Sequence, residues 1–133
     1  IFQKEKKLEV CEIQYEKILG MQCHEGFWEL NSELEKYCGF EVGKLWAVLK
    51  SVDYHTIGVT KAKEAEREFA TAIVIELFLL NDLWKENVAI RKATIWLDVV
   101  EKADISSCYI LGLSSKWRAL ALQIITQLDF AQA

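Results

Sequence analysis

Cys23 and His24 stand side by side in the sequence, and a thiol beside an imidazole is the pair that a cysteine nucleophile uses. The partners of such a dyad usually come from separate elements of the fold, and a reactive thiolate needs an electropositive site. We therefore expect Cys23 and His24 to be ordinary loop residues. Asp53 and His55 form a second acid–imidazole pair, for which we expect a solvated turn. The sequence thus predicts a domain that is not itself an enzyme.

The chain has four cysteines and two histidines that could serve as metal ligands. They form no C-x-x-C pair and no spacing typical of zinc. The chain also lacks the G-x-G-x-x-G and P-loop patterns that hold phosphates. We therefore expect no metal, no cofactor and no small-molecule substrate. The low density of cysteines favours reduced thiols in a cytoplasmic protein.

The composition argues against two further classes of function. The chain carries 16 basic and 20 acidic residues, a net charge of −4, and the basic residues are scattered among the acids. Nucleic-acid binding depends on clustered basic side chains that neutralise phosphates, so we expect none. The longest apolar run, residues 69–80, is interrupted by Glu76 and is shorter than the roughly 20 residues that span a bilayer. We expect no membrane segment.

The length of 133 residues and the hydrophobic content of 52% predict one folded domain over residues 1–133. Because the chain begins with Ile1, we expect it to be a fragment of a larger protein. The apolar spacing is helical nearly throughout, there is no proline, and no segment alternates with a period of two. The predicted fold class is all-α, a compact bundle of about five or six helices around a central long helix at residues 60–86. The other expected helices cover residues 4–19, 31–39, 41–52 and 87–103, with a last helix capped by Ser114 or Ser115.

The helix boundaries carry recognisable signals. Asn31 can cap the second helix, or Ser32 and Glu35 can form a capping box. Gly58 can supply a positive φ in the turn before the long helix. The residues expected to point inward from the helix over residues 41–52 are Val42, Leu45, Trp46 and Leu49.

The long helix changes character along its length. Its first half, residues 61–68, mixes charges of both signs, and we expect a solvated face there. Its second half is apolar around most of its circumference, through Leu80 and Trp84, and must be packed on several sides. Glu76 falls on the side that should be buried. Because a buried lone carboxylate is costly, we expect an internal ion pair or hydrogen bond for Glu76, with contact to a partner as the alternative.

Residues Gly26–Leu34, which read G-F-W-E-L-N-S-E-L, place two large aromatics beside a glycine just before a helix start. This segment resembles the pattern D-G-x-W-x-L-[TN]-x-E-L that opens a family of C-terminal domains of vault poly(ADP-ribose) polymerases, with relatives in von Willebrand A domain-containing proteins. The resemblance continues through residues 57–59 and 70–80. It departs from the family at Glu25, where aspartate is usual, and at Ser32, where proline is common.

This resemblance implies a non-catalytic protein–protein interaction domain. Its partner would be major vault protein, and it would target its parent protein to the vault particle, a cytoplasmic ribonucleoprotein complex that can also be nuclear. The ADP-ribosyltransferase activity of the family lies in another domain. Two alternatives remain open: the same fold could pack against a von Willebrand A-type domain of its own chain, or act as a thiol-dependent enzyme through Cys23 or Cys108.

The candidate partner-binding or motif residues are Phe27, Trp28, Leu30, Glu33 and Glu76. For Phe27 and Trp28 the preferred interpretation is structural, since large aromatics more often serve cores. The two rings would then fasten the loop onto the bundle, with Leu30 at the start of the helix. Among the five tryptophans, we expect most in the core and one or two at the rim of a partner surface.

Overall fold

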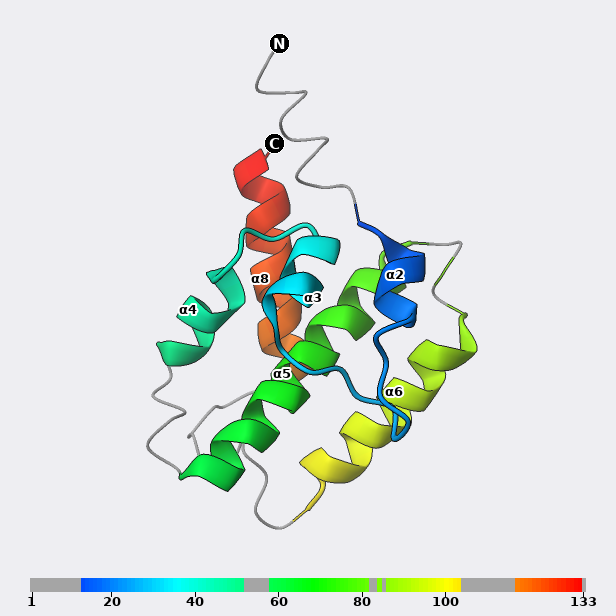
Figure 1. Ribbon diagram of the computed structural model, residues 1–133. Helices are drawn as coiled ribbons and strands as arrows, with labels where there is room; N and C mark the ends of the chain where they lie inside the picture. Colours follow the sequence, from blue (N-terminus) through cyan, green and yellow to red (C-terminus); the bar gives the residue numbers. More distant parts are fainter. Residues whose placement is uncertain (1–12, 52–57, 82–83, 85, 104–116, 133) are drawn as a thin grey trace.

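The computed structural model describes residues 13–51, 58–81, 84, 86–103 and 117–132, and side chains as far as residue 126. Over these ranges every regular element is a helix and no strand occurs, which confirms the predicted all-α class. The helices surround the long central helix α5 (Figure 1). Their bounds are α2 Tyr15–Leu19, α3 Ser32–Tyr37, α4 Lys44–Lys50, α5 Val59–Leu79, α6 Val88–Glu101 and α8 Trp117–Gln132.

The central helix α5 supplies much of the core. It packs against α8 along one side and against α6 along another. From Phe69 to Phe78 every residue is buried, as the apolar circumference of this half predicts. Gly58 precedes the helix with φ of +96°, so the predicted positive φ is confirmed. The rest of the turn, with Asp53 and His55, lies outside the described residues.

The predicted end of the long helix near residue 86 is wrong. The helix stops at Leu79, and Leu80 is 58% exposed although we expected it to be packed. Beyond it, the backbone N–H of Trp84 donates to the carbonyl of Asn81 in a turn. From this turn the Trp84 ring packs back on the bundle, stacked on Tyr15 at 5.4 Å. The apolar pattern therefore extends past the end of the helix because Trp84 packs on the bundle from a turn. It does not mean that the helix itself continues.

The first predicted helix is shorter than expected where the structure describes it. Of residues 4–19, the described part begins at Ile13, and Ile13 and Gln14 are not helical. The backbone N–H of Gln14 donates to the carbonyl of Tyr37, 2.9 Å away, which ties this part of the chain to the end of α3. Helix α2 then starts at Tyr15 and buries Ile18.

Helix α3 starts at Ser32, and Asn31 is its cap, because the Asn31 side chain accepts a hydrogen bond from the N–H of Leu34. The alternative capping box does not form, since Glu35 has a different partner. Its carboxylate is fully buried and accepts hydrogen bonds from the backbone N–H groups of Gly43, at 2.9 Å, and Leu45, at 2.8 Å. Glu35 thus holds the first turn of α4 from outside that helix.

Helix α4 begins at Lys44 rather than at residue 41, because the chain turns at Gly43 with φ of +90°. The prediction that Val42 points inward is wrong, since Val42 lies in this turn and is 69% exposed. Leu45 and Leu49 are buried as predicted, and Trp46 is partly buried.

Helix α6 is capped by Asn87, whose side chain accepts a hydrogen bond from the N–H of Ala89. Its buried stripe consists of Ile90, Ala93 and Leu97, close to the prediction. Helix α8 starts at Trp117 with that indole fully buried. The proposed caps at residues 114 and 115 lie outside the described residues.

Candidate functional site

The segment between α2 and α3 runs down beside α6, turns, and returns across α5 (Figure 1). We call residues 22–30 the clasp segment, because it touches both helices. On the α6 side, the Gln22 amide donates to the carbonyls of Gly26, at 3.0 Å, and Ala89, at 2.9 Å. Gly26 has φ of +119°, and a Cβ there would lie 3.2 Å from the backbone oxygen of Lys92. Glycine is therefore needed both for the turn and for the close approach to α6.

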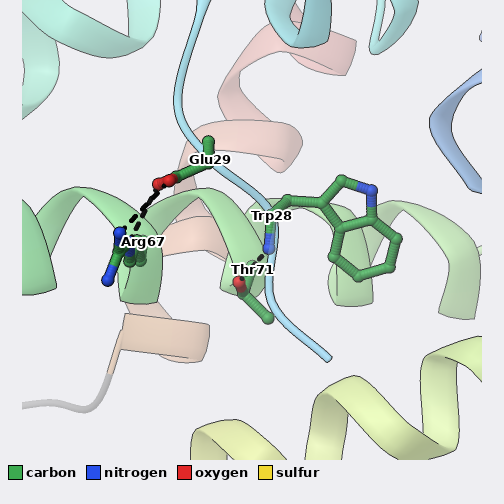
Figure 2. Close-up of polar contacts among 4 residues, drawn as sticks. All are labelled: Trp28, Glu29, Arg67 and Thr71. Carbon is green, nitrogen blue, oxygen red and sulfur yellow. Dashed lines mark hydrogen bonds and ion pairs between the residues drawn. The ribbon is translucent and has the colours of Figure 1, made fainter. Parts of the chain in front are cut away.

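The two aromatics of the motif point to different helices. The Phe27 ring lies 5.1 Å from the Trp96 ring of α6. The Trp28 ring is fully buried, and its indole N–H donates to the carbonyl of Ile18 at 2.7 Å. The backbone N–H of Trp28 also donates to the hydroxyl of Thr71 on α5, at 3.0 Å (Figure 2). These contacts confirm the structural interpretation of the two rings.

Next along the clasp segment, Glu29 reaches back to α5. Its carboxylate accepts from the guanidinium of Arg67 at 2.9 and 3.3 Å (Figure 2). This hydrogen bond is the main reason why the pKa of Arg67 is raised above its ordinary value. The guanidinium carbon of Arg67 also lies over the Phe27 ring, 4.8 Å from its centre. Arg67 thus connects both Phe27 and Glu29 of the clasp segment to α5.

The five candidate residues from the sequence do not gather on one surface. Phe27, Trp28 and Leu30 are buried in the clasp segment. Glu33 is exposed in the first turn of α3. Glu76 is buried on α5. The structure therefore gives the aromatic motif a packing role and leaves Glu33 as the one exposed side chain of the set.

Glu76 is paired inside the protein, as predicted. Its carboxylate, with the side chain 10% exposed, accepts from the guanidinium of Arg118 on α8, which is 40% exposed. The pair joins α5 to α8 across the main helix contact of the fold. An internal ion pair of this kind accounts for the acid without a partner molecule.

Removing the two members of this pair should have unequal effects. Arg118→Leu leaves a buried carboxylate without its cation and should lower the free energy of unfolding by about 2 kcal/mol. Glu76→Leu frees an arginine that can turn to water, so stability should stay within about 1 kcal/mol of the parent. Urea unfolding of both variants at neutral pH measures the difference. Equal destabilisation by the two would contradict the asymmetry.

A pocket opens beside the clasp segment, between the first half of α5 and the second half of α6. Its volume is about 310 Å³. Its apolar wall is formed by Phe27, Trp96, Val100 and Ala103, and its polar wall by Lys61, Glu64, Arg67 and Glu68. A concave site of this size, mostly apolar with a few polar groups, is the usual form of a ligand pocket.

Glu68 is the unusual group of this pocket. Its side chain is 4% exposed, and its carboxyl accepts a hydrogen bond from the indole N–H of Trp117 at 2.8 Å. Burial raises the pKa of Glu68 to about 7, in spite of the Trp117 hydrogen bond, which lowers it. The expectation of a solvated face over residues 61–68 is therefore wrong for Glu68. The signal was available in the spacing, since Glu68 shares a helical face with Ala65 and Ala72, both buried.

The thiol and metal hypotheses find little geometric support among the described residues. Burial, together with Glu29 and Glu25, raises the pKa of the Cys23 thiol, which disfavours the thiolate that a nucleophile needs. Burial likewise raises the pKa of Cys38. Cys108 lies outside the described residues. In the described part of the chain no group of three or more metal-binding side chains comes together, and no helix there is long and apolar enough to cross a membrane.

Comparison with known proteins adds no relative: no family model, no curated protein and no solved structure matches the chain.

Proposed function

We propose that this chain is a non-catalytic helical interaction domain that binds major vault protein and so brings its parent protein to the cytoplasmic vault particle. Two features support the proposal. The first is the resemblance of residues 26–34 to the opening motif of vault polymerase C-terminal domains. The second, which carries most weight for where binding occurs, is a row of exposed apolar side chains on α6.

The outer row of α6 consists of Val88, Ile95 and Val99, which are 75%, 66% and 64% exposed. Spacings of seven and four residues place all three on one side of the helix. The opposite side of α6 faces the core through Ile90, Ala93 and Leu97, so this helix is apolar on both faces. An exposed apolar row on a helix is typical of a surface that receives a partner.

The charges beside the outer row indicate the partner's character. Arg91 and Lys92 are exposed on α6 and Lys102 directly after it, and the exposed acids beside them are Asp98 and Glu86. Asp98 is itself paired with Lys102 at 2.9 Å. Arg91 is likewise paired with Glu86, at 3.5 Å, so the charges beside the row are largely balanced and the complementary surface on major vault protein would be mainly apolar.

The aromatic motif supports the proposal in a different way. Because Trp28 is fully buried and Phe27 nearly so, the motif can identify the domain without forming the binding surface. Phe27 of the motif contacts Trp96, and Gln22, four residues before the motif, donates to the carbonyl of Ala89, so that these contacts fix the position of α6 instead. The motif would thus present the outer row rather than contact the partner.

Purified chain and recombinant major vault protein provide the direct test. The double variant Ile95→Asp with Val99→Asp should weaken binding at least about tenfold, because apolar anchors dominate such interfaces. Val59→Asp is the matched control, since Val59 is 87% exposed at the start of α5. Both proteins should keep the parent's melting temperature. Absence of binding by the parent chain, or equal binding by the double variant, would reject the proposal.

A further inference from the structure

The pocket between α5 and α6 differs from the outer row of α6 in both place and chemistry. Of its basic groups, the Arg67 guanidinium is paired with Glu29, and the ammonium of Lys61 lies 3.1 Å from the carboxylate of Glu64. Glu68 has no ion pair among the residues that the structure describes. Its hydrogen bond from Trp117 involves one carboxyl oxygen, Oε1. The second oxygen is therefore available to a ligand.

The surroundings of Glu68 carry an excess of negative charge. Glu64 and Lys61 face it from its own helix, and Glu101 faces it from α6. The Glu101 carboxylate accepts from the backbone N–H of Trp117 at 2.9 Å, which places it at the start of α8. Among the described residues, and with Glu29 and Arg67 included, four carboxyl groups and two basic side chains lie in or beside the pocket. A cation is favoured there over an anion.

We propose that this pocket binds a primary alkylammonium ion of the kind that a lysine side chain carries. The ammonium group would lie against the Glu68 carboxylate, and the aliphatic stem along Trp96 and Val100. Burying an apolar stem while a charged head meets a carboxylate suits a pocket with one apolar and one polar wall. A volume of about 310 Å³ accommodates such a chain.

The protonation of Glu68 makes this binding depend on pH. A cation interacts favourably with the carboxylate form, which forms as the pH rises through the pKa of about 7. Binding should therefore strengthen from pH 5.5 to pH 8.5, by about 30-fold for a group with this pKa.

Nuclear magnetic resonance of the ¹⁵N-labelled chain tests the proposal, since the indole N–H groups of Trp96 and Trp117 report on the pocket. Titration at pH 8.5 with n-butylammonium should give saturable shifts of both signals, and n-butanol, which has the same stem without charge, should give none. Nα-acetyl-lysine methylamide serves as the second probe. Saturable shifts with both ammonium probes indicate a site that can also take a lysine side chain of a peptide, and shifts with n-butylammonium alone indicate a site for free amines.

Glu68→Gln is the decisive variant, because the glutamine can still accept from Trp117 while it carries no charge. It should weaken n-butylammonium binding at least about tenfold at pH 8.5 and remove the pH dependence. Glu33→Gln, an exposed acid on α3, should change neither. Equal binding by the Glu68→Gln chain, or no saturable shift in the parent, would overturn the proposal. Because the outer row of α6 plays no part, the result does not depend on binding to major vault protein.

Discussion

Replacing Trp28 by alanine is expected to lower the free energy of unfolding by about 4 kcal/mol, the usual range for removing a buried large aromatic. The Trp28 ring is fully buried, and it belongs to the same core as Ile18 and Leu34. Truncation would also leave the carbonyl of Ile18 without its indole donor. For a domain of this length the loss corresponds to a fall in melting temperature of roughly 15 °C.

A matched tryptophan separates this effect from the loss of any large side chain. Trp46 on α4 is only partly buried, so Trp46→Ala should cost about half as much or less. Trp28→Phe keeps an aromatic ring at this position, and its loss in free energy of unfolding should lie between those of the two alanine variants. Urea unfolding followed by circular dichroism measures all three. If Trp28→Ala were no more destabilising than Trp46→Ala, the Trp28 contacts of the clasp segment would contribute no more to the free energy of unfolding than a partly buried tryptophan does.

The second large effect concerns Glu35. Glu35→Ala should lower the free energy of unfolding by about 3 kcal/mol, because it leaves the backbone N–H groups of Gly43 and Leu45 without an acceptor. Both donors lie at the start of α4, where the hydrogen bonds to a carboxylate are also favoured by the helix dipole. The amide signals of residues 43–45 should lose protection against hydrogen exchange more than those of α5.

Glu33 provides a control on the same helix. It is exposed in the first turn of α3, two residues from Glu35, so Glu33→Ala should stay within about 0.5 kcal/mol of the parent. Glu35→Gln should be intermediate, because the amide oxygen can accept one of the two hydrogen bonds without the negative charge. Similar stabilities for the alanine variants at 33 and 35 would show that Glu35 does not hold α4.

Local pattern was enough to predict the helical class, the central position of the long helix and the burial of Glu76. It also predicted the cap at Asn31 and the positive φ at Gly58. These features depend on neighbours within a few residues, so a single sequence contains them. The identity of the Glu76 partner did not follow, since Arg118 lies 42 positions away.

The errors have a shared cause, which is contact between distant segments. Glu35 satisfies all local requirements of a capping box, yet the start of α4 takes its carboxylate. The helix over residues 60–86 was predicted too long because Trp84 packs on Tyr15 from a turn, and the apolar spacing looks the same in both cases. Likewise, the pocket at Glu68 depends on α6 and α8 together. Such pairings appear only when the fold is known.

The clasp segment also bears on how this chain reaches its native state. Its hydrogen bonds join residues 43 positions apart, from Trp28 to Thr71, and 67 positions apart, from Gln22 to Ala89. Most small helical domains are dominated by local contacts and therefore fold fast, whereas long-range contacts must first overcome the entropy of closing a large loop. We therefore expect the segment that fixes α6 against α5 to form late in folding. Until it docks, a nascent chain can have its helices without yet having the outer row of α6 in its final position.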